Sequence, residues 1–429
     1  MFISFHLRRA GTAAAASAFA SPLSSAFVFR GSAPVLFVPK SFAGLRLPQA
    51  QFSSASIRNH FMQPPEAKRV CAENMVPKIG THNGTFHCDE VFACFLLRQL
   101  PEYKEAEIVR TRDPAVLATC DIVVDVGGEF DPKKHRYDHH QSTLLRAEKL
   151  HRAPPADKIQ RLFVETFHSL CPGKPWVTRL SSAGLVYLHF GRLVLEQLTQ
   201  LKPDDGQLEV LYDKLYENFV EAVDAVDNGI SQYDGEARYA VSTTLSARVS
   251  YLNPPWNSKS QDTEEGFQQA MKMVGAEFLG RVEFYQNSWL PARAVVERAV
   301  RNRTQVDPSG EVLVLEQGGC PWKEHLFSLE KDLNVETPIK FVLYPDQSGQ
   351  WRVQCVPAGL HTFQNRLSLL EEWRGVRDEA LSSLSGITGC VFVHASGFIG
   401  GKPQPAGGAG DGPSNPPIRC QGLREPNGS

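Results

Sequence analysis

Apolar positions between residues 77 and 141 change repeatedly from β-branched runs to helical spacing. Apolar residues over 88–100 recur three and four positions apart, which predicts a helix with one buried face, stopped by Pro101. Runs of buried-strand type occupy residues 78–80, 107–111 and 121–126. Strands that alternate with helices predict a parallel, doubly wound sheet, in which ligands bind at the carboxyl ends of the strands.

Helical patterns dominate the middle of the chain. A serine precedes the pattern at 181–201 as a normal N-cap, and Asn228-Gly229 follows the pattern at 207–227 as a normal C-terminal stop. Two further helices are predicted over residues 264–286 and 290–301.

Strand-like runs return after residue 311 and predict a second domain. They cover residues 312–315, 339–344, 351–356 and 390–394, and the turn 346–349 joins two of them as a hairpin. The last run leads into a glycine-containing segment that ends at Gly401. The predicted fold class is therefore α/β, with a parallel-sheet domain and inserted helices over 77–305 and a smaller C-terminal α/β domain over 306–401.

The N-terminal segment differs in composition. The first 65 residues contain no Asp or Glu, while six Arg and Lys residues are spread among Ala, Ser and Phe. An Arg-rich, Ser-rich, acid-poor segment is typical of an organelle transit peptide, so we expect residues 1–70 to direct the chain to the mitochondrial matrix. A merely disordered tail is the alternative.

Two other segments lack a clear period. Residues 141–175 are charged and contain prolines, which predicts an insertion or a mobile loop. Residues 402–429 are rich in Pro and Gly and are predicted to be a disordered tail.

Charge limits the partners of the chain. Removing the eight basic residues and one acidic residue of positions 1–70 from a formal charge of −2 leaves about −9. Such a protein does not hold nucleic acid by a broad basic surface, so a polyanion must bind in a local groove where metal ions supply positive charge. The nine cysteines form no C-x-x-C pair, which indicates reduced thiols. No apolar run approaches the roughly 20 residues that a membrane span needs, so no membrane partner is expected.

Three clusters of imidazole and carboxylate side chains fall within residues 82–140. Each cluster borders an apolar segment, and this ligand chemistry suits Mn, Mg, Fe or Zn. More than four such groups indicate more than one metal, and two ions bridged by carboxylates can clamp both oxygens of a phosphoryl displacement. The clusters are the loop 81–90, the segment 121–128 with Asp121 and Asp125, and Asp138-His139-His140. They predict a metal-dependent phosphoesterase.

Four motifs in this order resemble the melanocyte-proliferating-gene (MYG) family of the DHH phosphoesterase superfamily. The motifs are Gly80-Thr81-His82-Asn83-Gly84-Thr85-Phe86-His87-Cys88-Asp89-Glu90, Asp125-Val126-Gly127-Gly128, Tyr137-Asp138-His139-His140-Gln141 and Val223-Asp224-Ala225-Val226-Asp227-Asn228-Gly229. The resemblance spans about residues 77–401 and implies a DHH-type fold for the first domain. Members of the family are taken to be 3′–5′ RNA exonucleases of mitochondria and nucleus, so the resemblance implies that activity, RNA as partner and the nucleus as a second location.

The resemblance also implies a site for two divalent ions, Mn²⁺ or Mg²⁺. His82 and His87 would ligate one ion, Asp89 and His139 would ligate the second, and Asp125 would bridge both. A water activated by both ions would attack phosphorus, so no protein nucleophile is needed.

Further residues follow from the same motifs. Asp227 would complete the second ion site, and Asp224 lies one helical turn earlier on the same face. Asp224 is a lesser candidate, either as a ligand or as an acceptor that orients an imidazole. Asp138 and His140 would hold His139 or touch the substrate. The candidate catalytic residues are Asp125, His139 and His140.

Substrate contacts are expected from both domains. Arg110 and Arg112 follow a strand and could grip phosphate, although salt bridges to nearby aspartates are an equal alternative. His394 ends a strand and is a further candidate. The resemblance implies that Gly400 and Gly401 bring backbone amides close to a phosphate.

The chain departs from the superfamily after its glycine pair, where a histidine or similar group is normal and Lys402-Pro403-Gln404-Pro405 stands here. This departure keeps a catalytically impaired metal-binding scaffold open as an alternative. The acidic net charge favours a second alternative, a phosphoesterase that acts on pyrophosphate or short oligonucleotides. The main prediction is a metal-dependent 3′–5′ RNA exonuclease.

Overall fold

The computed structural model describes residues 76–140 and 165–402 of the chain. The predicted transit peptide, most of the predicted insertion at 141–175 and nearly all of the predicted C-terminal tail lie outside these residues. Those three predictions therefore stay predictions.

The first sheet has five strands in the order β2-β1-β3-β5-β4. Strands β2, β1, β3 and β5 pair in parallel, and β4 pairs antiparallel at one edge. The strands are β1 (Lys78–Thr81), β2 (Glu107–Arg110), β3 (Ile122–Val124), β4 (Phe130–Asp131) and β5 (Arg136–Tyr137). The three predicted strands are confirmed, whereas β4 and β5 escaped prediction because two residues carry no recognisable period.

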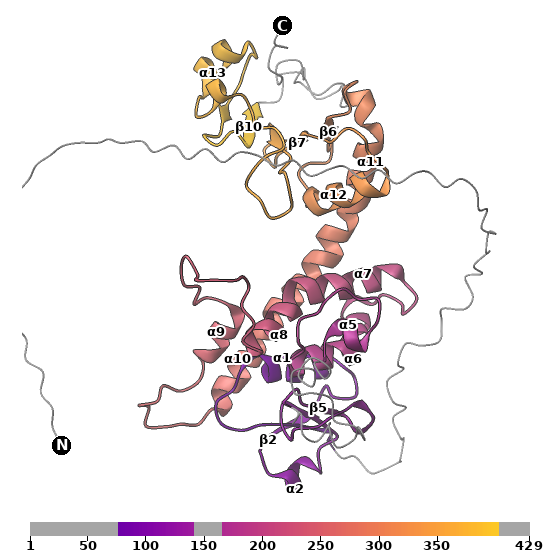
Figure 1. Cartoon of the computed structure of the whole chain (residues 1–429), viewed down its shortest axis with the longest axis vertical. Helices are drawn as coiled ribbons and strands as arrows, with labels where there is room; N and C mark the ends of the chain where they lie inside the picture. The colour runs from indigo at the N-terminus through magenta and orange to yellow at the C-terminus, as the bar shows by residue number, and fades with distance from the viewer. Residues whose placement is uncertain (1–75, 141–164, 403–429) are drawn as a thin grey trace, which may run out of the picture. The chain divides into compact units, whose positions relative to one another are not determined.

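Helices supply most of the remaining structure. The described helices are α1 (Cys88–Leu97), α2 (Pro114–Leu117), η1 (Pro132–Lys134), α5 (Phe167–Leu170), α6 (Ser182–Thr199), α7 (Gly206–Leu215), η2 (Tyr216–Val220), α8 (Glu221–Asp227), α9 (Leu245–Ser250), α10 (Glu264–Phe284), η3 (Tyr285–Trp289), α11 (Leu290–Val306), α12 (Trp322–Asp332), η4 (Glu371–Trp373) and α13 (Asp378–Ser385). Figure 1 shows α10 running through η3 into α11 as one long helix. The sequence predicted a break between helices 264–286 and 290–301. The structure instead has the π-helical turn η3 there, so the helix continues up to and through Pro291.

The two faces of β3 pack into different clusters because its side chains alternate. Ile122 and Val124 join the main core, in which α1 packs against α6 and α10. Val123 faces the other way and contacts the cluster that contains Leu117 and Cys120. Burial on both faces explains why this strand reads as a continuous apolar run in the sequence.

The second sheet also has five strands, in the order β6-β7-β8-β10-β9. Strands β6 and β7 are parallel, and the other pairs are antiparallel, including the predicted β7–β8 hairpin. The strands are β6 (Val312–Val314), β7 (Phe341–Pro345), β8 (Trp351–Cys355), β9 (Phe392–Val393) and β10 (Ile399–Lys402). Strand β10 contains Gly400 and Gly401 and was not predicted, because pairing on both sides overrides the low strand propensity of glycine. The observed architecture confirms the α/β fold class.

No helix in the described part of the chain is both long and apolar enough to cross a membrane.

Two glycines of α10 test how tightly the main core is packed. A Cβ atom on Gly275 would lie 2.2 Å from the Phe95 ring, whereas a Cβ atom on Gly280 would meet nothing within 4 Å. We expect Gly275→Ala to lower the free energy of unfolding by about 1–3 kcal/mol through overpacking. The matched control Gly280→Ala should raise it by about 0.5–1 kcal/mol through helix propensity. Denaturant unfolding of both variants measures this, and equal effects would contradict the packing described.

Candidate metal centre

Three neighbouring parallel strands end at the same edge of the first sheet. His82 follows β1, Asp125 follows β3, and Asp138 follows β5. Helix α1 begins beside this edge and carries Asp89 in its first turn, while Asp227 is the last residue of α8. The parallel topology therefore gathers chemical groups from loops that are far apart in the sequence.

The gathered side chains form overlapping groups of metal-ligand type. In each group one ligand atom per residue lies within 4.8 Å of the others. The groups are His82 with His87 and Glu90, Asp125 with His139 and His140, Asp89 with His139 and Asp227, and Asp89 with Glu90 and Asp125. The structure thus places seven of the candidate site residues close together and adds Glu90; the seven are His82, His87, Asp89, Asp125, His139, His140 and Asp227.

The ring of His82 is oriented by its own loop. Its Nδ1 lies 3.2 Å from the Asn83 carbonyl oxygen, which can accept the ring proton. Its Nε2 lies 3.1 Å from Glu90 Oε1 and 3.3 Å from Asp125 Oδ2. A backbone acceptor on one ring nitrogen leaves the other nitrogen free for a cation, which is the usual arrangement of a metal-binding imidazole.

Glu90 is the member of the centre that sequence reasoning missed. Its carboxylate is fully buried and accepts hydrogen bonds from the backbone N–H of His87 at 2.8 and 3.0 Å. This is the N3 position of α1, where a carboxylate commonly reaches back to the N-cap amide. The sequence does contain a signal for this role, because Glu90 follows His87 by three residues at the start of a helical pattern.

Several buried polar atoms of the centre lack a hydrogen-bond partner among the described residues. They are both carboxylate oxygens of Asp89, both ring nitrogens of His139 and Oδ2 of Asp227. His139 Nε2 nevertheless lies 3.1 Å from Asp227 Oδ2 and 3.4 Å from Asp125 Oδ1. Buried polar groups are normally satisfied, and oxygen and imidazole atoms at such spacing fit a divalent cation.

The carboxylates of the centre lie close enough for their negative charges to repel one another. Burial raises the pKa of Asp89 well above its usual value, and the charges of Asp125 and Glu90 raise it further. Burial also raises the pKa of Asp227. Burial would raise the pKa of Asp125, but the nearby imidazole rings of His139, His140 and His82 outweigh it and lower that pKa below its usual range. The centre therefore needs positive charge, which protons or cations can provide.

The histidines supply part of that charge. Burial lowers the pKa of His82, but hydrogen bonds with Asp125 and Glu90 outweigh it and raise that pKa to about 10. Hydrogen bonds with Asp125 and Asp138 raise the pKa of His140 to about 10 against the effect of burial. Protons on these rings would have to leave when a metal ion binds.

The backbone around Asp125 is held in an uncommon conformation. Asp125 has φ of 56°, and Gly127 and Gly128 have φ of 98° and 68°. The Asp138 carboxylate fixes this turn, since it accepts hydrogen bonds from Gly128 N at 2.6 Å and His140 N at 2.8 Å. A left-handed aspartate persists only where its surroundings determine it, and such residues cluster at functional sites.

Asp224 lies outside the ligand groups found in the described residues. Its carboxylate is fully buried and accepts from Ser181 N and Oγ at 3.0 and 2.7 Å and from Tyr216 Oη at 3.0 Å. The adjacent Ser182 hydroxyl donates to Asp125 Oδ1 at 3.0 Å. Asp224 therefore holds the start of α6, and Ser182 at that start orients Asp125. Both carboxylate oxygens of Asp224 accept hydrogen bonds from protein donors.

An open cleft of about 630 Å³ lies against the centre. Arg112 lines it together with His82, His87, Asp125, His140 and Asp227. Arg110 does not line it: its guanidinium donates to the Gly84 carbonyl at 2.7 Å and to Thr263 Oγ1 at 2.8 Å. Only Arg112 of the two predicted arginines is placed to meet a ligand in this cleft, whereas Arg110 fixes the loop that carries the histidines.

The segment around α9 supplies another wall of the cleft. Thr244, Ser246 and Ser250 line it with hydroxyl groups. Arg179 donates to the His139 carbonyl at 3.0 Å and supports the loop after β5. Sequence reasoning missed these residues because isolated serines, threonines and arginines carry no distinctive spacing.

The predicted substrate residues of the second sheet have different surroundings. His394 is exposed, and its Nδ1 lies 2.9 Å from Ser396 Oγ. Gly400 and Gly401 lie in β10 between β8 and β9, where a Cβ atom on Gly401 would lie 2.2 Å from Arg352 Nη1. The close packing of Arg352 is therefore a second reason for glycine at this position, and a phosphate contact stays a prediction.

Comparison with known proteins places the chain in a family. A family model with the name MYG1_exonuc and the description uncharacterised protein family UPF0160 matches residues 78–408. The MYG1 exonuclease of Bos taurus is 60% identical over 364 residues, which cover 84% of this chain and 91% of that protein. The MYG1 exonuclease of Homo sapiens is 62% identical over 339 residues, covering 79% and 85%. The MYG1 protein of Dictyostelium discoideum is 46% identical over 331 residues, covering 76% and 92%. The chain therefore belongs to the MYG1 exonuclease family.

Proposed function

We propose that this protein is a metal-dependent 3′–5′ RNA exonuclease. Membership of a family with named exonucleases supports a nuclease, and thus a hydrolase of phosphodiester bonds. The observation that carries metal dependence is the set of buried oxygen and imidazole atoms without hydrogen-bond partners among the described residues, beside an open cleft. RNA as substrate and the 3′ polarity rest on the family resemblance of the motifs.

Two ions would be held by different halves of the centre. His82, His87 and Glu90 would hold one ion, Asp89, His139 and Asp227 would hold the other, and Asp125, which lies near both His82 and His139, would contribute to both. Two divalent ions, Mn²⁺ or Mg²⁺, would supply Lewis acidity that polarises the phosphoryl group and stabilises its developing charge. The protein's own contribution is to fix the ligands through Asn83, Ser182 and Asp138 before substrate arrives.

His140 and Arg112 would act on the substrate directly. The His140 side chain is 64% exposed and reaches the cleft, and its ring is held by Asp138 and Asp125. An imidazole in this position can donate a hydrogen bond to a phosphoryl oxygen. Arg112 on the wall of the cleft would neutralise the neighbouring phosphate.

The composition of the first 70 residues supports mitochondria as the site of action. Targeting to the mitochondrial matrix is therefore part of the proposal.

The activity is tested with the full chain, Mn²⁺ and single-stranded RNA labelled at either end. We expect stepwise shortening from the 3′ end, and we expect His139→Ala to reduce the rate by about a hundredfold or more because one ion loses a ligand. His361→Ala, at an exposed histidine of the second sheet region, is the matched control and should keep full activity.

Substrate length separates the proposal from its main alternative. An enzyme that hydrolyses only pyrophosphate or very short oligonucleotides would leave the longer RNA intact. Endonucleolytic products, or equal activity in His139→Ala, would contradict the proposed mechanism. Metal binding without turnover of any phosphoester would indicate the other alternative, a catalytically impaired metal-binding scaffold.

Metal binding should displace protons at neutral pH. The pKa of His82 is about 10 and the pKa of Asp89 is raised, so the metal-free centre carries protons at pH 7. We expect Mn²⁺ binding to release protons and to become tighter as pH rises toward 10, because fewer protons then compete. Titration calorimetry in buffers of different ionisation enthalpy measures the release. Binding heats that are independent of the buffer would contradict this electrostatic description.

A further inference from the structure

A second cavity, of about 430 Å³, lies among elements of the second sheet region and the π-helical turn η3 in the middle of the long helix. Five of its lining residues are aromatic, and none of them belongs to the metal centre. The aromatic residues are Phe284, Tyr285, Trp289, Trp322 and Tyr344. Small-molecule sites have this size and combine apolar walls with a few placed polar groups.

The cavity lies where ligand sites form in α/β structures. Strands β6 and β7 are parallel, and the loop from β6 to α12 leaves the carboxyl end of β6. Gly319 in this loop packs closely against Tyr344, since a Cβ atom there would be 3.0 Å from the Tyr344 ring. The other wall is the π-helical turn η3, a feature that is frequent at functional sites.

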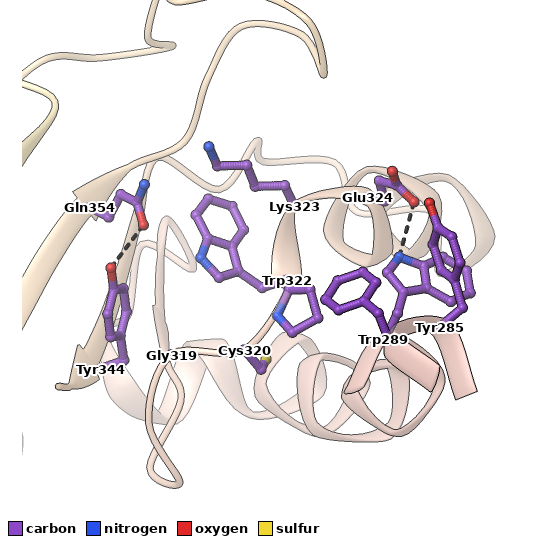
Figure 2. Close-up of a pocket in the computed structure, with 11 residues that line it drawn as sticks. Tyr285, Trp289, Gly319, Cys320, Trp322, Lys323, Glu324, Tyr344 and Gln354 are labelled. Atoms are coloured by element: carbon purple, nitrogen blue, oxygen red, sulfur yellow. Dashed lines mark hydrogen bonds between the residues drawn. The ribbon is translucent and has the colours of Figure 1, made fainter. Parts of the chain in front are cut away.

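The walls are fixed without a ligand. The Trp289 carbonyl oxygen lies 2.7 Å from His325 Nε2, and the two rings are 4.3 Å apart. Trp289 Nε1 donates to Glu324 Oε2 at 3.0 Å, as Figure 2 shows. A preformed wall lowers the ordering cost of binding.

Two polar side chains at the cavity, Gln354 and Glu324, each use one of their two terminal atoms in contacts with neighbouring side chains. Tyr344 Oη donates to Gln354 Oε1 at 3.0 Å, and in Figure 2 the amide nitrogen of Gln354 points away from Tyr344. No partner of that nitrogen is found within the described ranges. Glu324 uses Oε2 for Trp289 and for Lys214 at 3.2 Å, which leaves Oε1 as an acceptor. The cavity thus offers one donor and one acceptor beside aromatic rings, which matches the edges and faces of a nucleobase.

Positive charge lies next to the cavity. Arg352 pairs with Tyr344 across β7 and β8 and is two residues from Gln354, so all three share one face of the sheet. The Arg352 guanidinium is engaged within the protein, since Nη2 is 2.5 Å from Asp346 and Nη1 is buried. Lys323 is exposed and lines the cavity. Cations beside an aromatic cavity favour a nucleotide over an uncharged ligand.

We propose that this cavity is a subsite for one nucleobase of single-stranded RNA, with the adjoining phosphate at Lys323. The inference rests on RNA being the substrate of the proposed exonuclease and gives that RNA an anchor outside the metal centre. An acidic protein gains little from broad electrostatic attraction, so base stacking, which tolerates any sequence, supplies affinity that repeated cleavage requires.

The test is binding of a fluorescent single-stranded RNA to the full chain in EDTA, where no cleavage occurs, measured by anisotropy. We expect Phe284→Ala and Gln354→Ala each to weaken binding by roughly tenfold. The weakening by Phe284→Ala should persist at high salt because stacking is not screened. Phe363→Ala, at an exposed phenylalanine that does not line the cavity, is the control and should bind as the wild type does.

Wild-type affinity in both cavity variants, or an equal loss in Phe363→Ala, would overturn the inference. Displacement of the RNA by an equal concentration of a free mononucleotide would assign the cavity to mononucleotides and overturn it as well. Absence of RNA binding by the wild type would also overturn it. RNA binding with the expected losses but without Mn²⁺-dependent cleavage would contradict the exonuclease and support the subsite.

Discussion

Mutual repulsion among buried carboxylates is the constraint on which the first sheet and the helices around it depend. Asp89, Glu90, Asp125 and Asp227 meet at one edge of a sheet with little access to water. Isolated buried charges are costly, so the arrangement requires protons or cations to be stable. The surrounding features follow from this need: the oriented His82 ring, the turn held by Asp138, and the serines that join Asp125 to Asp224. A site built this way could bind divalent cations, which would offset the repulsion among its carboxylates.

Much of this site could be predicted from the sequence because its ligands lie in short motifs after strands. Parallel topology then brings His82, Asp125 and His139 to one edge, so strand order mattered more than exact strand bounds. Glu90 lies inside the first motif but was not predicted as part of the site. Its position in the sequence indicates a helix cap, whereas the structure shows that the same carboxylate also faces His82. Arg110 was one of two candidate phosphate contacts, but its side chain donates to the Gly84 carbonyl. The direction of this side chain depends on packing that the sequence does not show.

The second sheet was harder to predict for a physical reason. Strands β6, β7 and β8 are apolar runs and were expected, whereas β10 contains a glycine pair that reads as a turn. Its strand conformation comes from pairing with β8 and β9, and the missing side chain of Gly401 leaves room for Arg352. The aromatic cavity likewise joins residues from η3, α12 and β7 that are distant in the sequence. Such sites arise from tertiary packing and carry no local signal.

The count of metal ions per chain tests the central claim most directly. The full chain is loaded with Mn²⁺, freed of excess ion by gel filtration and analysed for bound metal. We expect two ions in the wild type, fewer in Asp227→Asn, and two in the isosteric control Asp224→Asn, because Asp224 binds protein donors instead of an ion. A wild-type chain that retains no metal, or an equal loss in both variants, would contradict a two-ion centre.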